Sequence, residues 1–206
     1  MRYTGSKNKV ARREGMDLGL KTPGSKSQAT LLKKLTVLPG QHGTKGRRKI
    51  SEYGRQLREK QKLRFMFGLT ETKLKSYFSK AARKPGDTSI HLSELLEKRL
   101  DNVVYRLGLA PTRAASRQLI SHKHITIADK VVSIPSYLVK VGDVIGFRKA
   151  ETKKIPAIEA ALEKKDEFLA PWLERKADHG KLAAEPTSEI LEKQINLRFV
   201  VEYYSR

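Results

Sequence analysis

Residues 99–147 decide the fold of this chain: RLDNVVYRLGLAPTRAASRQLISHKHITIADKVVSIPSYLVKVGDVIGF. The stretch predicts a helix that ends at Gly108, a second helix that opens at Pro111-Thr112, and then short strands. The second helix carries Arg113 and Arg117. A compact helix-helix-hairpin with a basic helix is typical of modules that bind folded RNA.

The spacing of apolar residues before Gly108 predicts one continuous helix, opened by Ser93, with a buried stripe that runs from Leu92 to Leu107. Thr112 is the expected N-cap of the next helix, because its hydroxyl can accept from a free N–H group of the first turn. Helical spacing turns three residues of that helix outward: Arg113, Ser116 and Arg117.

The period then changes to two, which predicts strands over 124–127, 130–134 and 144–147, with Ala128-Asp129 as the tight turn between the first two. Together with the flanking segments, these patterns predict an α+β chain. Its parts are a basic extended N-terminal arm, a small helical domain, and an inserted helix-helix-β-hairpin RNA-binding module with a small antiparallel sheet.

Composition and periodicity divide the chain into three regions. Residues 1–45 are a basic extension without a sustained helix or strand period, expected to be mostly disordered without a partner. Residues 46–92 should form the helical domain, completed by residues 176–206. The RNA-binding module spans 93–175, with 99–147 as its core.

Other segments are expected as follows. Ser51 should cap a helix over 52–66, and Thr70 the helix after it. Residues 177–188 look like an exposed loop. The apolar stretch 195–204 fits both a helix and a strand period, so both stay open.

Charge narrows the class of partner. The chain has 206 residues, with 43 Lys and Arg against 22 Asp and Glu, and a formal net charge of +21. Residues 1–65 carry 18 basic and 4 acidic side chains, a net charge of +14. Such an excess repels itself in a compact chain and is typical of proteins that bind a polyanion. We therefore expect RNA to meet the N-terminal segment and one face of the module.

Composition also excludes several chemistries. The chain has no cysteine, which rules out disulfides, thiol catalysis and Cys-ligated zinc. It has neither an apolar run of the ~20 residues a membrane helix needs nor an apolar stretch after its basic start, as in a secretory signal. We expect a cytoplasmic protein without a membrane partner. An Arg-rich transit peptide is the competing interpretation, against which stand Glu14, Asp17 and the glycines.

Candidate RNA-binding residues before the module are cations, with two aromatic rings that can stack on bases. They are Arg2, Tyr3, Lys7, Lys9, Arg12, Arg13, Lys45, Arg47, Arg48, Lys49, Tyr53, Arg55, Arg58 and Lys62. Four cations within residues 45–49 are typical of a nucleic-acid patch, the alternative being a basic linker. Core packing is the favoured alternative for Tyr53 and Phe65, whereas Tyr3 lies among cations and is the better candidate for stacking.

Candidates in the module gather at the second helix and the strand after it: Arg113, Arg117, Ser121, His122, Lys123 and His124. Arg suits phosphate because its planar fork donates two parallel hydrogen bonds. RNA duplexes hide their base edges, so we expect contacts to phosphates and 2′-hydroxyls. The alternative is a solvated helix face. No metal site is expected, because the histidines lack ligand spacing and nearby carboxylates.

Motifs in order along the chain resemble a known family. They are ARREG at 11–15, PGQHG at 39–43, SEYGRQLREKQKLRFMFG at 51–68, RLDNVVYRLG at 99–108, TRAASRQLISHKHI at 112–125 and VEYYSR at 201–206. Over essentially its whole length the chain resembles the bacterial fourth protein of the small ribosomal subunit.

The resemblance implies a structural protein that binds small-subunit ribosomal RNA (rRNA) early in assembly, at a helix junction of the 5′ domain. It implies contact with the neighbouring fifth small-subunit protein and a place near the channel through which messenger RNA (mRNA) enters, in support of translational accuracy. In many bacteria it also implies repression of its own operon. No cofactor, no enzymatic activity and no homo-oligomer are expected.

The chain departs from some relatives at two points. Four zinc-binding Cys of some relatives are absent. Ala128-Asp129 stands where many have Asn-Gly, which leaves the turn type open.

Two other classes of protein share such a module. Some pseudouridine synthases combine it with a catalytic Arg-Leu-Asp motif, and residues 99–101 have that sequence. Here Asp101 falls inside a predicted helix of the module, where a structural ion pair is the expected role, and the chain after 148 is too short and too charged for the catalytic domain. A free RNA chaperone or heat-shock RNA-binding protein is the other alternative.

Overall fold

The computed structural model describes residues 3–46, 49–163, 169–176 and 179–206. Contacts divide the chain into two compact units, residues 1–89 with 191–206 and residues 90–190. Within the described residues, no helix has the length and apolar character to cross a membrane.

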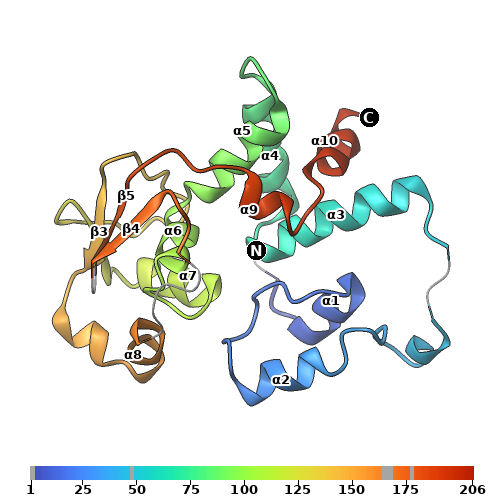
Figure 1. Ribbon diagram of the computed structural model, residues 1–206, viewed down its shortest axis with the longest axis horizontal. Helices are drawn as coiled ribbons and strands as arrows, with labels where there is room; N and C mark the ends of the chain where they lie inside the picture. The colour runs from blue at the N-terminus through green and yellow to red at the C-terminus, as the bar shows by residue number, and fades with distance from the viewer. Residues whose placement is uncertain (1–2, 47–48, 164–168, 177–178) are drawn as a thin grey trace. The chain divides into compact units, whose positions relative to one another are not determined.

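The first unit is helical (Figure 1). Its elements are α1 (Lys7–Glu14), α2 (Lys26–Leu32), the 3-10 turn η1 (Gly43–Lys45), α3 (Glu52–Met66), α4 (Glu71–Ala82) and α10 (Leu197–Ser205). Ser51 caps α3 as predicted, its hydroxyl accepting from the Gly54 N–H at 3.2 Å. Thr70 caps α4 in the same way, at 3.4 Å from the Lys73 N–H. Local cap chemistry thus sets where both helices begin.

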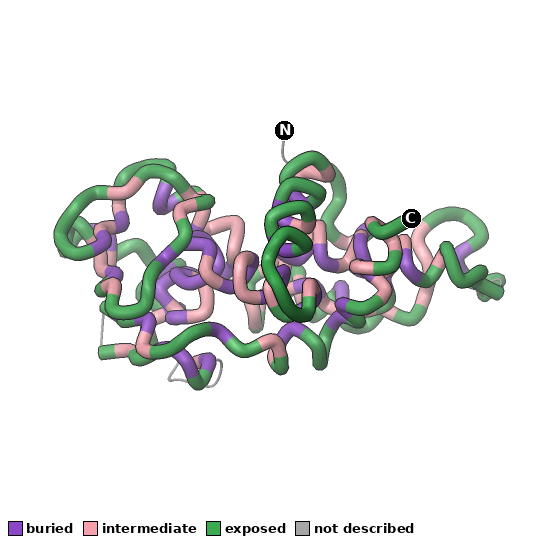
Figure 2. Tube along the Cα trace, turned by 90° about the horizontal axis from the view of Figure 1, so that it is seen from above, coloured by how far each residue is buried: buried purple, intermediate pink, exposed green. Residues whose placement is uncertain are grey.

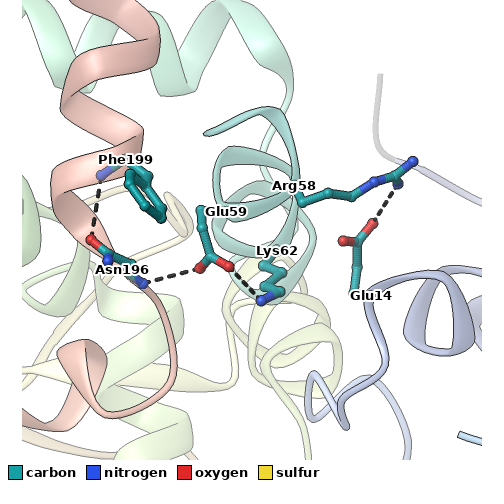
Figure 3. A network of polar contacts seen from close by, with 6 residues as sticks. All are labelled: Glu14, Arg58, Glu59, Lys62, Asn196 and Phe199. Atoms are coloured by element: carbon teal, nitrogen blue, oxygen red, sulfur yellow. Dashed lines mark hydrogen bonds and ion pairs between the residues drawn. The ribbon is translucent and has the colours of Figure 1, made fainter. Parts of the chain in front are cut away.

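The stretch 195–204, for which helix and strand both fitted, is helical. α10 lies beside α3 (Figure 1). The Asn196 side chain caps α10 by accepting from the Phe199 N–H at 3.4 Å, and the Asn196 N–H donates to Glu59 of α3 at 3.0 Å (Figure 3). One residue therefore both starts α10 and ties it to α3.

Residues 1–45 contain two short helices, α1 and α2, where no sustained helix period was found. Their apolar side chains are few and widely spaced, and only the run 29–35, which overlaps α2, predicted a helical turn or two. Four are nevertheless buried: Val10, Ala11, Leu18 and Leu31.

The second unit combines helices with a five-stranded antiparallel sheet of order β2-β1-β3-β5-β4. The helix α5 (Thr88–Glu97) leads into it along the chain. There follow α6 (Leu100–Arg106), α7 (Arg113–Ser121), β1 (Ile125–Ile127), β2 (Lys130–Val131), β3 (Val144–Phe147), η2 (Ala150–Lys154), α8 (Pro156–Leu162), β4 (Leu173–Lys176), β5 (His179–Leu182) and α9 (Glu189–Glu192). The predicted α+β class is confirmed.

The single helix predicted from Ser93 to Gly108 is wrong, because the chain breaks it between α5 and α6. Arg99 has an extended backbone, with φ −64° and ψ 135°. The N–H groups of Leu100 and Asp101 donate to carbonyls of the loop 135–137, at 2.8 and 3.1 Å. The helical spacing of buried apolar residues continues through the break, from Leu92 to Leu107, so this spacing does not reveal the break.

The turn between β1 and β2 lies where the sequence placed it. Ala128 and Asp129 have φ of 44° and 64°, the positive values that a two-residue hairpin turn of type I′ requires. Neither residue is a glycine, so the turn is strained at Ala128. The strand predicted over 130–134 is too long, because the chain turns again at Ile134, whose carbonyl accepts from the Tyr137 N–H.

The exposed loop expected over 177–188 is also wrong, because it contains β5, which pairs with both β3 and β4. A Cβ on Gly180 would overlap the Leu107 side chain, so the absence of a side chain there lets β5 lie close to α6. The strands β4 and β5 lie in the second unit, so that of residues 176–206 only 191–206 belong to the helical unit.

The core of the second unit lies between its helices and one face of the sheet. Buried and exposed positions alternate along the chain, as expected where each element packs on one side (Figure 2). Core side chains come from α6, α7, the sheet and the segment before β4: Leu100, Val103, Leu107, Ile120, Ile125, Ile145, Trp172 and Leu182.

Candidate RNA-binding surface

The first unit presents most of its candidate residues to solvent. Arg2, Arg47 and Arg48 lie outside the described residues. The exposed candidates are Tyr3, Lys7, Lys9, Arg13, Lys45, Lys49, Tyr53 and Arg55. Arg12, Arg58 and Lys62 are only partly exposed and have intramolecular partners.

Arg12 organises the loop that leads to the basic cluster at 45–49. Its guanidinium donates to the carbonyls of Val37 and Leu38, both at 2.9 Å. The Leu38 carbonyl lies so close to Gly43 that a Cβ there would overlap it. Arg12 is therefore a residue that holds the loop, which leaves little of its guanidinium for phosphate.

Arg58 and Lys62 belong to a polar network along α3 (Figure 3). Arg58 pairs with Glu14 of α1 at 3.2 Å, and Lys62 pairs with Glu59 at 2.5 Å. The Glu14 side chain is 1% exposed, and this burial raises its pKa although the Arg58 charge opposes the shift. The Arg58 side chain stays 40% exposed, so it can hold α1 and still face a ligand.

Of the aromatic candidates, Tyr53 is placed differently from the expectation and Tyr3 is not. Tyr53 is 49% exposed, and its ring lies 5.7 Å from that of Tyr203, so the core packing favoured for Tyr53 is wrong. Position 53 lies in the first turn of α3, where α10 covers only part of the ring. Tyr3 is 47% exposed, with its ring edge-on to Phe65 at 5.2 Å. Phe65 is partly buried.

In the module, Arg113 turns inward rather than outward. Its Nε donates to Asn102 at 2.8 Å, and its guanidinium lies 4.5 Å from the centre of the Tyr105 ring. Burial, with repulsion from Arg106, lowers the pKa of Arg113. The prediction that Arg113 faces outward is therefore wrong, because an acceptor on α6 draws the side chain into the contact between α6 and α7.

Ser116 is the second residue of the predicted outward face that the structure buries. It is fully inaccessible, and its hydroxyl donates to the Thr112 carbonyl at 3.1 Å. Thr112 itself caps α7 as predicted, accepting from the Ala115 N–H at 3.2 Å. The face that α7 presents to α6 is thus wider than its apolar residues alone indicate.

Asp101 has the structural role that the sequence predicted. Its carboxylate accepts from Arg99 at 3.0 and 2.6 Å, with both side chains buried. Arg117 lies 3.6 Å from the same carboxylate, with its side chain 26% exposed. The single negative charge of Asp101 is shared by Arg99 and Arg117, so it compensates only part of the Arg117 charge at the surface.

The remaining candidates meet at the corner where α7 passes into β1. Ser121, His122 and Lys123 are exposed, and Lys123 has a φ of 63°, the left-handed conformation with which the chain leaves the helix. The His124 ring is held by Thr152, with Nδ1 to Oγ1 at 3.1 Å. The rings of His122 and His124 are 6.3 Å apart.

Strand pairing adds two cations that sequence reasoning missed. The Arg148 N–H donates to the His124 carbonyl at 2.8 Å, which places Arg148 and the next residue beside this corner, and both are exposed. Only the register of β1 against β3 brings them there, and the sequence held no local signal for it. We call the following set the α7–β1 corner: Ser121, His122, Lys123, His124, Arg148 and Lys149.

Comparisons with known proteins give the family of the chain. The chain matches the family models of the ribosomal protein S4/S9 N-terminal domain over residues 2–97 and of the S4 domain over residues 98–145. The small ribosomal subunit protein uS4 of Pelotomaculum thermopropionicum is 46% identical over 208 residues, with 100% of this chain and 99% of the relative covered. The uS4 proteins of Chromobacterium violaceum and Porphyromonas gingivalis are 44% and 45% identical over 207 residues, with the same coverage.

These matches confirm the resemblance, and with it the expectations that the chain is a non-enzymatic protein and carries an RNA-binding S4 domain. The identity extends over the whole chain and both units. The chain therefore belongs to the small ribosomal subunit protein uS4 family.

Proposed function

We propose that this chain is a structural constituent of the small ribosomal subunit that works in the cytoplasm and binds the subunit's rRNA through two positive surfaces. One is formed by the exposed cations of the first unit, from Lys7 to Arg55. The other is the α7–β1 corner of the module. The relatives at about 45% identity are named as small-subunit proteins, which supports the ribosomal assignment.

The α7–β1 corner is the observation that carries the proposal. Lys123, Arg148 and Lys149 are exposed and come from two separate segments, so they present cationic side chains with a fixed spacing. A rigid cationic corner can displace condensed counterions from RNA and also set the register of the protein on it. The cations of the first unit then add affinity.

The finer roles rest on the resemblance to the family. They are binding at a helix junction of the 5′ domain early in assembly, contact with the fifth small-subunit protein, and a place near the channel that mRNA enters, in support of accuracy. Repression of the chain's own operon would use the same RNA-binding surfaces on a messenger. No homo-oligomer is needed for any of these roles.

A salt series tests the proposal. The purified chain is titrated against small-subunit rRNA between 50 and 200 mM salt. If it contacts about six to ten phosphates, the affinity should fall on the order of a thousandfold or more across this range, because each contact releases counterions. Footprinting on the same RNA should show protection at one helix junction.

Duplex DNA of equal length is the matched competitor. A protein that recognises folded RNA by shape should prefer the rRNA at every salt concentration. A shallow salt dependence, or a preference for the DNA duplex, would contradict the proposal. Cosedimentation with small subunits at high salt separates a ribosomal constituent from a free RNA chaperone.

A further inference from the structure

The five-stranded sheet has a second face, opposite the core. Strand register defines it: Thr126 pairs with Val131 and with Gly146, and Val144 pairs with Lys181. Neighbouring residues Ile125, Ile127 and Ile145 point to the buried side. We call the opposite side the outer sheet face, and its residues are His124, Thr126, Val131, Val144, Gly146, Arg148, Glu174, Lys176, His179 and Lys181.

The outer sheet face is open and positively charged. The side chains of Arg148, Lys176 and Lys181 are exposed, and Glu174 is the acidic residue among them. Two valines of this face are also exposed, Val131 at 42% and Val144 at 44%. A solvated antiparallel sheet usually alternates buried with polar residues. Exposed valines beside cations instead fit a ligand that is negatively charged but carries apolar rings.

Gly146, in the middle of β3, has no structural need to be glycine. A Cβ there would meet His179 at 3.6 Å and Thr126 at 3.9 Å, which are ordinary contacts. Its φ lies outside the positive region that favours glycine. Glycine weakens a strand, and inside one it often marks a place where a ligand approaches the backbone. Gly146 thus leaves a shallow gap in the outer sheet face.

The outer sheet face is continuous with the α7–β1 corner. His124 and Arg148 belong to both, because the register that pairs them sets them at the end of β1 and β3. A nucleic acid bound at the corner could extend along β3 past Gly146 and Val144 to Lys181, with a cation at each end of this path.

We propose that the outer sheet face binds a single-stranded or loop segment of the same RNA, with its backbone near Arg148, Lys176 and Lys181 and a base or ribose over Gly146. The inference rests on the proposed function and assigns it a second subsite. His179 borders the gap and its side chain is exposed, so its ring could stack on a base. The net positive charge of this face favours RNA, a polyanion, over a protein partner as the ligand.

Gly146→Val tests the gap without disturbing the fold. The added side chain has ordinary contacts at its Cβ, and valine is favoured in strands, so the unfolding midpoint should stay the same or rise. The branched side chain would lift a base off the backbone, and the affinity for small-subunit rRNA should fall about tenfold, the size of one lost stacking contact. An unchanged affinity would overturn the proposal.

A charge-matched pair of variants tests the cations. Lys176→Gln with Lys181→Gln should weaken binding and reduce the salt slope by about two phosphate contacts. Lys75→Gln with Lys80→Gln, on the exposed side of α4, changes the net charge equally. Equal losses in both variants would mean that only the field of the whole chain matters, and the proposal fails.

The absence of cysteine allows a direct position test on the full chain. An iron chelate attached to Val144→Cys should cleave the bound rRNA at one unpaired segment, and the same chelate on Lys75→Cys should not cleave there. No cleavage from position 144, although the labelled chain binds, overturns the second subsite and leaves the proposed function intact.

Two further outcomes are decisive. A Gly146→Val chain that binds RNA normally but fails to enter reconstituted subunits would mean that a protein covers this face, against the proposal. An unmodified chain that ignores rRNA at low salt would overturn both the proposed function and the second subsite.

Discussion

The two basic regions of the molecule use their cations differently. In the first unit most candidate cations are exposed. In the module, four arginines have internal partners: Arg99 and Arg117 at Asp101, Arg106 at Glu97 and Arg113 at Asn102. The cations of the first unit are thus exposed and can contact RNA, whereas many cations of the module form internal contacts that stabilise its fold. A count of basic residues locates a polyanion site only where their side chains reach solvent.

The largest effect on stability should come from removing the negative charge of Asp101. Asp101→Asn leaves the buried Arg99 without its counter-charge, and breaking a buried pair in this way costs about 3–5 kcal/mol. Urea unfolding followed by a probe in the second unit measures the loss. Asp129→Asn, in the exposed turn, is the matched control and should stay within about 0.5 kcal/mol. Equal stability of both variants would show that the Arg99 pair does not support the module.

The next prediction compares a cation of the module that has an internal partner, Arg113, with an exposed one, Lys123. Arg113→Ala removes a hydrogen bond from a charged group to Asn102 and should lower the free energy of unfolding by about 1.5–3 kcal/mol. Lys123→Gln should leave stability unchanged and reduce the salt slope of rRNA binding by about one. Calorimetry and a binding series at several salt concentrations measure the two quantities. If only the Lys123 variant lost stability, then Lys123 rather than Arg113 would stabilise the module, and the prediction would be wrong.

Sequence reasoning succeeded where the determinant is local. Ser51, Thr70 and Thr112 each cap the helix that begins at the next residue, by accepting from the N–H group three residues further on. Gly108 follows the end of α6 with a φ of 69°. Such signals need no knowledge of distant contacts. The break at Arg99 was missed, because its cause is a hydrogen-bonding loop about 36 residues further along the chain.

For the candidate site, too, the sequence predicted the residues set by local structure and missed those set by long-range contacts. Lys123 and its neighbours follow directly from their place after α7. Arg148 and Lys149 were missed because only strand pairing brings them beside His124, and Arg113 was misplaced because its acceptor Asn102 lies on another helix. Long-range register and internal acceptors decide which cations face a ligand, and neither is encoded in a short window of sequence.

A smaller effect should come from the strained turn of the module. Ala128→Gly relieves the positive φ of 44°, which costs an L-residue about 1–2 kcal/mol, but makes the unfolded chain more flexible. A net gain of up to about 1 kcal/mol is expected in urea unfolding. The same substitution at Ala160, exposed in the helix α8, should instead cost about 1 kcal/mol. A loss at both positions would mean that Ala128 is not strained.

The smallest effect concerns two carboxylates of the first unit whose pKa values move in opposite directions. Burial raises the pKa of Glu14 above its ordinary 4.5. For Glu71, burial also raises the pKa, but hydrogen bonds from Tyr204 at 2.7 Å and Lys60 at 2.9 Å outweigh it, and the net pKa is lowered. A raised pKa means that the folded chain holds the proton more tightly, so Glu14 reduces stability as pH rises through this range. The lowered pKa of Glu71 has the opposite consequence, a contribution present above its ordinary pKa and lost in acid.

Glu14→Gln and Glu71→Gln, each compared with the unmodified chain by urea unfolding, should therefore show their pH dependence on opposite sides of the ordinary carboxyl pKa of 4.5. The glutamine at position 14 keeps an acceptor for Arg58 and removes the buried charge, so its stability relative to the unmodified chain should improve toward neutral pH. The glutamine at position 71 loses the charge that Lys60 and Tyr204 favour, so its relative stability should worsen as the pH rises to 4.5 from below and then stay level. Parallel pH profiles for the two variants would mean that burial governs both carboxylates alike. Opposite slopes would show that the ionised form of the buried Glu14 destabilises the first unit, whereas the ionised form of the partly exposed Glu71 stabilises it.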